Sequence, residues 1–228
     1  MLILALAAHA ATPWSVTPEI GTEVPLRVGA GVRVEGPGRI RAGLSGGFVP
    51  KGYVALANDA TTALFEGYTE EYATLVETAL ASSLIGRVDV GWRPHPRAGW
   101  WFAGGASLIG LGGEATAAEL LEGLTGTELP RTAATPIVLT ARATVVTLDV
   151  QTGWDIRVWR ELVVRPLIGW SFTVSSHSRI EADTTELPPR LASAVHTLED
   201  EAATELDAVI EAYVHPPTVG LSVGWVFR

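Results

Sequence analysis

The stretch VPLRVGAGVRVEGPGRIRAGLSGGF, Val24 to Phe48, alternates apolar residues with polar or small ones almost without a break. Apolar side chains occupy every second position from Val24 to Val34, and the pattern resumes after Gly36-Pro37-Gly38. A period of two in two segments joined by a Gly-Pro-Gly turn predicts a β-hairpin. The pattern alone leaves open whether the apolar face packs in a soluble core or contacts lipid.

Five later segments alternate in the same way, at 87–93, 100–108, 146–158, 162–175 and 218–227. Segments of about ten residues are long enough to cross a bilayer at a tilt. With the opening hairpin they make seven strands. Bacterial single-chain barrels have even strand numbers, so we expect an eighth at Trp14–Ile20, followed by a turn at Gly21-Thr22-Glu23.

Between the hairpins the period becomes helical, which predicts helices near 61–82, 115–124 and 189–213. The third begins at Pro188-Pro189 and ends before His215-Pro216-Pro217. Short turns on one side and long helical connections on the other are typical of an up-and-down antiparallel transmembrane β-barrel. We therefore expect one all-β domain of about eight strands over residues 11–228, with α-helices in the long extracellular connections.

The first ten residues are apolar and end in Ala8-His9-Ala10, which predicts a weak signal peptide without a positively charged start. A buried or frayed first strand is the alternative. Hydrophobic residues make up 47% of the chain, yet no run of about 18 apolar residues predicts a transmembrane helix. The absence of cysteine excludes disulfides and thiolate metal sites.

The polar face of the hairpins carries most of the strand charges. In a soluble protein this face would be solvated. It is also rich in Gly and Ser, which suits the crowded interior of a small barrel, and such an interior would need its charges paired. The predicted internal charge network comprises Arg27, Arg33, Arg39, Arg41, Arg87, Asp89, Arg93, Asp149, Asp155, Arg157 and Arg165.

Most of the aromatic residues near the short turns and the C-terminus are tryptophans, as expected for a ring at a membrane interface. This predicted girdle comprises Trp92, Trp100, Trp101, Trp159, Trp225 and Phe227. In its strand-turn-strand-loop order, its tryptophan girdle and its ending Leu221-x-Val223-x-Trp225-x-Phe227, the chain resembles the small bacterial outer-membrane β-barrel proteins of the eight-stranded class. The resemblance implies residence in the outer membrane, contact with outer-membrane lipid and lipopolysaccharide, and insertion by the outer-membrane assembly machinery.

No catalytic, metal or cofactor motif is recognisable, and an enzyme is not the favoured interpretation. His95, His196 and His215 are expected in solvated or capping roles. His177-Ser178 with Glu181 is the one Ser/His/acid grouping expected near lipid, and it motivates the alternative of a rim-located lipid-modifying enzyme.

The long connections, residues 51–82, 112–136 and 177–215, hold 18 acidic residues and four basic ones. This charge excludes nucleic acid as a partner. The acidic residues are explained by a solvated helix face or, alternatively, by divalent cations or a basic partner at the acidic loops. We expect a structural or surface-display barrel with a side-chain-filled lumen and an acidic helical cap. The alternatives are a narrow anion-attracting channel or the rim-located enzyme.

Overall fold

The computed structural model describes residues 14–50, 52–53, 83–95, 98–116, 138–182 and 189–228. The predicted signal peptide and the predicted helix at 61–82 lie outside these residues. The elements, in chain order, are β1 (Ser15–Val24), β2 (Arg27–Glu35), the 3₁₀ turn η2 (Pro37–Arg39), β3 (Ile40–Phe48), β4 (Leu84–Trp92), β5 (Trp100–Thr116), β6 (Val138–Trp154), β7 (Ile156–Arg157), β8 (Leu162–Ala182), α4 (Pro189–Tyr213) and β9 (Pro217–Trp225).

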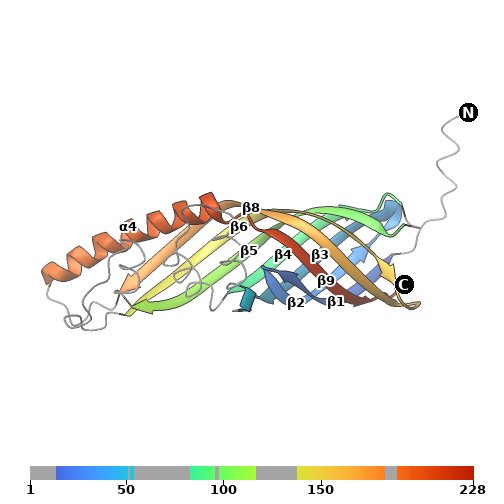
Figure 1. Ribbon diagram of the computed structural model, residues 1–228, viewed down its shortest axis with the longest axis horizontal. Coiled ribbons are helices and arrows are strands. Elements are labelled where there is room, and N and C mark those ends of the chain that lie inside the picture. Colours follow the sequence, from blue (N-terminus) through green and yellow to red (C-terminus); the bar gives the residue numbers. More distant parts are fainter. Residues whose placement is uncertain (1–13, 51, 54–82, 96–97, 117–137, 183–188) are drawn as a thin grey trace, which may run out of the picture.

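The strands form one closed antiparallel sheet (Figure 1). Each long strand pairs with the next along the chain, and β1 pairs with β9. The two-residue β7 follows β6 directly after Asp155, so the barrel has eight long strands. The predicted up-and-down barrel of about eight strands is confirmed.

The first strand is longer than its sequence predicts. β1 continues through Gly21, Thr22 and Glu23, and the connection to β2 is Pro25-Leu26. The predicted turn at residues 21–23 is therefore wrong. Glu23 pairs with Arg27 on β2 and with Gly220 on β9. Because both neighbouring strands offer partners for this backbone, extending the strand satisfies hydrogen-bonding groups that an earlier turn would leave open.

Three strands extend past the others at the end where α4 lies (Figure 1). β5 and β6 have 17 residues each and β8 has 21, whereas β1 has 10 and the remaining long strands have nine. The helix predicted at 115–124 is wrong at its start, because Ala115 and Thr116 end β5 and pair with β6. Residues 117–124 lie outside the described part of the chain.

A bulge in β8 changes which side chains face outward. Val146 pairs with Ser175 and Thr147 pairs with Thr173, so one extra residue, Val174, lies between them. An extra residue shifts the two-residue period by one. Phe172 is exposed before the bulge, and His177 is exposed after it. The uninterrupted alternation expected along this strand ends at Val174.

The helix α4 occupies the residues predicted for the third helix, Pro189–Tyr213. The backbone N–H of Val214 still donates to the Ile210 carbonyl at 3.0 Å, and Pro216 and Pro217 then lack the N–H that a helix needs. No helix in the described segments combines the length and apolar character needed to cross a membrane.

Candidate functional site: the barrel interior

On most strands, buried and exposed residues alternate. On β4, the Arg87 side chain is buried while Val88 is 56% exposed, and Asp89 is buried while Val90 is 62% exposed. Leu84 on the same outward face is 71% exposed. The buried polar set continues on other strands with Arg33, Arg41, Ser107, Thr147, Asp149, Gln151, Arg165, Ser171 and Thr218. The charged face of the alternating pattern therefore points inward, and the apolar face points outward.

Asp155 is the centre of a first group of ion pairs, near the short turns. It lies between β6 and β7 and accepts from Arg165 Nε at 2.8 Å. Arg41 Nη2 lies 3.4 Å and Arg93 Nη1 3.7 Å from its carboxylate oxygens. Glu19 on β1 extends the group by pairing with Arg165 and, at 3.3 Å, with Arg33. One carboxylate thus joins residues from β3, β8 and the turn after β4.

Asp149 is the centre of a second group, farther along the barrel. Its Oδ2 accepts from Arg87 Nε at 3.1 Å and from the Ser107 hydroxyl. Its Oδ1 accepts from Ser171 at 2.5 Å and from Thr147 at 3.2 Å. These donors satisfy the hydrogen-bonding capacity of a buried carboxylate, which would otherwise be costly to remove from water.

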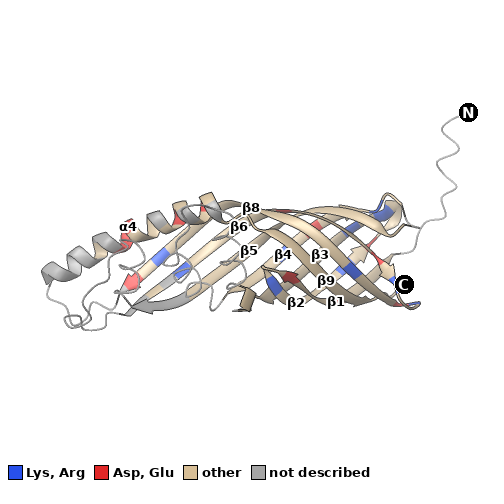
Figure 2. Ribbon diagram, in the orientation of Figure 1, with Lys and Arg blue, Asp and Glu red and all other residues tan. Residues whose placement is uncertain are grey.

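The remaining pairs connect and extend these groups. Arg87 also binds Glu23, which in turn lies 2.5 Å from Arg27, and Arg33 lies 3.8 Å from Asp89. A further interior pair joins Arg93 to Glu35. Within the described part of the chain, the ion-paired interior residues are six arginines (Arg27, Arg33, Arg41, Arg87, Arg93 and Arg165) and six carboxylates (Glu19, Glu23, Glu35, Asp89, Asp149 and Asp155). Equal numbers of opposite charges leave this interior close to neutral, which lowers the cost of burying it. Figure 2 shows acidic and basic segments close together on neighbouring barrel strands.

Two residues of the predicted network stay outside these pairs. Arg157 is exposed on β7, near a short turn. Arg39 has a positive φ of 67° and donates to the Pro94 carbonyl at 2.7 Å, which joins two short turns. Conversely, the predicted network lacks three of the ion-paired carboxylates, Glu19, Glu23 and Glu35, although Glu35 has the same parity as Arg33 on β2. Glu19 has the parity of Ser15 and Thr17, so the alternation could have identified it, but Glu23 was expected in a turn.

Trp101 differs from the rest of the predicted girdle. It is fully buried, and the guanidinium carbons of Arg33 and Arg41 lie 5.1 and 4.7 Å from its ring centroid. Cations above an indole face are attracted to it. The prediction that Trp101 belongs to the outer ring was wrong. Trp101 lies two residues before Ala103, so the period of two already placed it on the inward face. The other girdle residues, Trp92, Trp100, Trp159, Trp225 and Phe227, are exposed and lie at the end of the barrel with the short turns.

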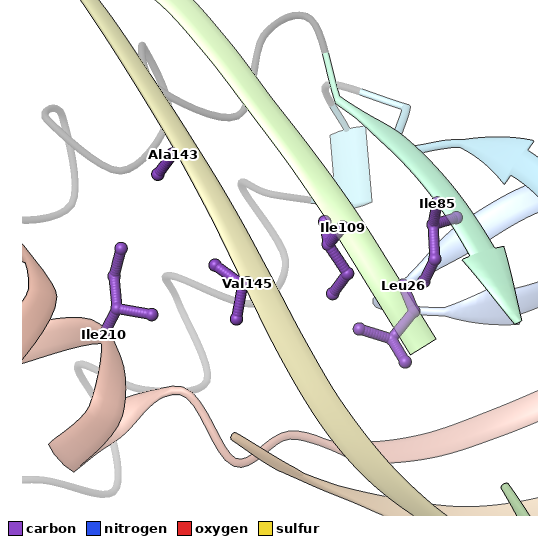
Figure 3. Close-up of a cluster of buried hydrophobic side chains, with 6 residues drawn as sticks. All are labelled: Leu26, Ile85, Ile109, Ala143, Val145 and Ile210. Carbon is purple, nitrogen blue, oxygen red and sulfur yellow. The ribbon is translucent and has the colours of Figure 1, made fainter. Parts of the chain in front are cut away.

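An apolar cluster lies at the opposite end of the interior (Figure 3). It comprises Leu26, Ile85, Ile109, Ala143, Val145 and Ile210. Ile210 comes from α4, so the helix packs on the inner face of the extended strands. Leu206 and Val214 pack against the same cluster.

The charged end contains a small polar cavity of about 20 Å³, which has room for about one water molecule. Its lining includes Glu35, Arg93 and Asp155. The Nε atoms of Arg33, Arg41 and Arg93 have no hydrogen-bond acceptor within the described part of the chain. These N–H groups could donate to an anion. Across the described segments, no three or more His, Cys, Asp or Glu side chains are grouped so that they could hold a metal ion.

The Ser/His/acid grouping expected at the rim is not assembled. His177 is exposed on the outward face of β8, whereas Ser178 is buried on the inward face. A nucleophile and its base must lie within hydrogen-bond reach, and adjacent residues of a strand point to opposite sides.

No protein-family model matches this chain, and no curated protein matches it in sequence. Among solved structures, the chain is similar to the N-terminal β-barrel domain of Pseudomonas aeruginosa OprF, with 9% identity and a TM-score of 0.43 over 93% of this chain and 97% of that one. It is similar to Acinetobacter baumannii CarO2, with 9% identity and a TM-score of 0.40 over 95% and 99%. It is also similar to a major outer membrane protein from Thermus thermophilus, with 11% identity and a TM-score of 0.45 over 95% and 100%. The similarity to these structures is one of fold alone.

Proposed function

We propose that this chain is an outer-membrane β-barrel protein of structural or surface-display type. The observation that carries the proposal is the reversed distribution of side chains, apolar outside and charged inside. Ile20, Leu44 and Val219 are each more than 60% exposed, on three different strands. Apolar surface in water costs about 25 cal/mol per Å², so a wall of this kind requires lipid around it.

The dimensions of the wall support the same proposal. The shortest of the long strands have nine residues. At about 3.3 Å per residue and a tilt near 40°, such a strand rises roughly 23 Å along the barrel axis, close to the apolar band of about 25 Å in outer-membrane barrels. The exposed tryptophans at the short turns fit a membrane interface.

We further propose that the lumen is filled and that the display role follows from this. The six arginines and six carboxylates occupy one part of the interior, and the apolar cluster around Ile109 and Val145 occupies the other. A continuous aqueous path would have to pass through both layers. The helix α4, with exposed Asp200, Glu201 and Glu211, would then be part of an acidic cap on the outer side.

A narrow anion-attracting passage is the second candidate. It is favoured by the Nε–H groups of Arg33, Arg41 and Arg93, which have no acceptor among the described residues and belong to side chains that line the small polar cavity. The rim-located enzyme has no comparable support, because His177 and Ser178 lie on opposite faces of β8.

Fractionation and heat modifiability test the proposal. The protein should be recovered in the outer-membrane fraction, and its unheated form should migrate differently from its boiled form in detergent gels, because a closed barrel resists unfolding by detergent alone. Recovery of a folded, soluble monomer without detergent would overturn the membrane assignment.

A further inference from the structure

Two arginines lie directly opposite each other on the outward face of the extended strands. Arg142 on β6 pairs in register with Arg179 on β8, and both side chains are exposed. Arg179 lies 3.7 Å from the carboxylate of Glu181, but these two side chains are 75% and 63% exposed, so water screens the pair. Like charges directly opposite in a sheet repel, so this arrangement favours an anion between the two arginines. Figure 2 shows basic segments side by side where β6 and β8 run past the shorter strands.

The arginine pair lies just beyond the expected edge of the apolar band. Arg142 is 12 residues along β6 from Trp154, an exposed tryptophan at the short-turn end. At about 3.3 Å per residue this is about 40 Å along the strand, or about 30 Å along the axis at a tilt near 40°. The apolar band is about 25 Å tall, so the guanidiniums are at the height of the lipid headgroups.

A hollow in the outer wall begins beside the same place. It has a volume of about 480 Å³ and is lined by Gly47, Leu84, Ile85, Gly86, Leu108, Gly110 and Thr144. A Cβ atom added at Gly86 or Gly110 would meet no atom within 4 Å. Gly110 pairs with Thr144, and Arg142 is the next outward-facing residue along β6 from Thr144. The hollow is therefore an apolar groove directly on the membrane side of the arginine pair.

We propose that one phosphorylated lipid of the outer leaflet binds here, with its phosphate between Arg142 and Arg179 and an acyl chain in the hollow. Guanidinium groups bind phosphate oxygens through paired hydrogen bonds, and an acyl chain would fill a depression that the wall leaves open. α4 packs on the inner face of these strands, through Ile210 against the cluster of Ala143 and Val145, and so does not compete for this site (Figure 3). The inference rests on the proposed membrane barrel and adds its lipid specificity.

Binding can be measured by native mass spectrometry of the detergent-solubilised barrel, with dioleoylphosphatidic acid and dioleoylphosphatidylcholine as probes. These lipids share their chains and differ in their headgroups. The wild type should prefer the phosphatidic acid. Replacing Arg142 and Arg179 together with Gln should weaken its binding about fivefold per arginine, the ratio given by roughly 1 kcal/mol for each basic residue near an anionic surface. Arg157→Gln, an exposed arginine at the other end of the barrel, is the matched control and should bind like the wild type.

The Gly110→Leu variant tests the proposed acyl-chain site. The leucine should fill the hollow and weaken the binding of both lipids. Gly104→Leu is its control, because Gly104 lies outside the hollow on the same outward face of β5, and an added Cβ there meets its nearest atom at 3.8 Å. Inorganic phosphate should not displace the lipid.

Equal binding by the Arg142/Arg179 double variant and Arg157→Gln would overturn the headgroup site. Equal binding by the two leucine variants would overturn the acyl-chain site, and displacement by inorganic phosphate would replace the lipid with a free-anion site. Heat-modifiable migration of every variant keeps these outcomes separate from a failure of the membrane assignment.

Discussion

Arg87 illustrates at the scale of one residue how this barrel keeps charges buried. Its Nε lies 2.9 Å from the Ser107 hydroxyl and 3.1 Å from Asp149, and its Nη1 binds Glu23. The side chain is almost completely buried, so water cannot replace these partners. An interior charge is stable here because residues from β1, β5 and β6 surround it, although they are distant in sequence.

We therefore expect Arg87→Ala to lower the free energy of unfolding by about 3–5 kcal/mol, because Asp149 would be left buried without its ion-pair partner. Arg157→Ala, which removes an exposed arginine, should change it by no more than about 0.5 kcal/mol. Urea titration of the folded barrel in lipid vesicles, followed by tryptophan fluorescence, gives both values. Equal stabilities of the two variants would show that the interior pair contributes nothing.

On the outward face, the cost of introducing a charge should depend on the depth of the residue in the bilayer. Leu148 is 54% exposed in the middle of β6, and its replacement by Arg should destabilise the inserted barrel by roughly 2–4 kcal/mol if it lies near the bilayer midplane. Val158, also exposed but beyond β7 at a short turn, should tolerate Arg at a cost of about 0–1 kcal/mol, as near an interface. The same vesicle titration compares them. Tolerance of Arg at both positions would contradict a lipid-facing outer wall.

At the scale of the elements, α4 is held on β8 by polar contacts as well as by the apolar cluster. The Ser176 hydroxyl donates to Asp207 at 2.7 Å, and its backbone N–H donates to Glu211 at 3.0 Å. Partial burial would raise the pKa of the Asp207 carboxyl, but hydrogen bonds from Ser178 and Ser176 outweigh this effect and hold its pKa below the ordinary value of 3.8. These contacts attach the helix to the extended strand beyond the barrel.

A depressed carboxyl pKa means that the contribution of Asp207 to helix docking is fully present above about pH 3.8 and is lost as the pH falls through the lower native value. Amide exchange in α4, corrected for the intrinsic pH dependence of exchange, should be constant between about pH 7 and 4 and should accelerate only as the pH falls below about 3.8. Asp207→Asn should remove this acid-dependent step. A step of equal size in the variant would assign it to another carboxylate.

At the scale of the whole molecule, the two interior layers are arranged in series. The charge network lies toward the short turns, and the apolar cluster lies toward α4. Under the proposed function, these two layers would close the central path of the barrel, once by ion pairs and once by packed aliphatic side chains.

The purified protein in a planar bilayer should consequently produce a current equal to that of the bare lipid. Insertion is verified on the same preparation by heat-modifiable migration. Resolved current steps carried by chloride, and lost on Arg41→Gln, would contradict the filled lumen and favour the anion passage.

The period of two determined much of this protein without reference to its tertiary structure. It identified the hairpins, it separated Val88 and Val90 from Arg87 and Asp89, and the change to a helical period located α4. These features are local, because a strand alternates its side chains and a helix repeats every 3.6 residues whatever they pack against. Most of the interior arginines could be identified for this reason.

Only the closed barrel decided which charges meet. Asp155 binds Arg41, Arg93 and Arg165 because closure and register bring their strands together around one interior, and no sequence spacing encodes that meeting. The placement of Glu23 within β1 and the bulge at Val174 likewise depend on the backbone partners that the neighbouring strands provide. Alternation fixes the face on which a side chain lies, but strand pairing fixes its height and its partners, and pairing is a property of the whole sheet.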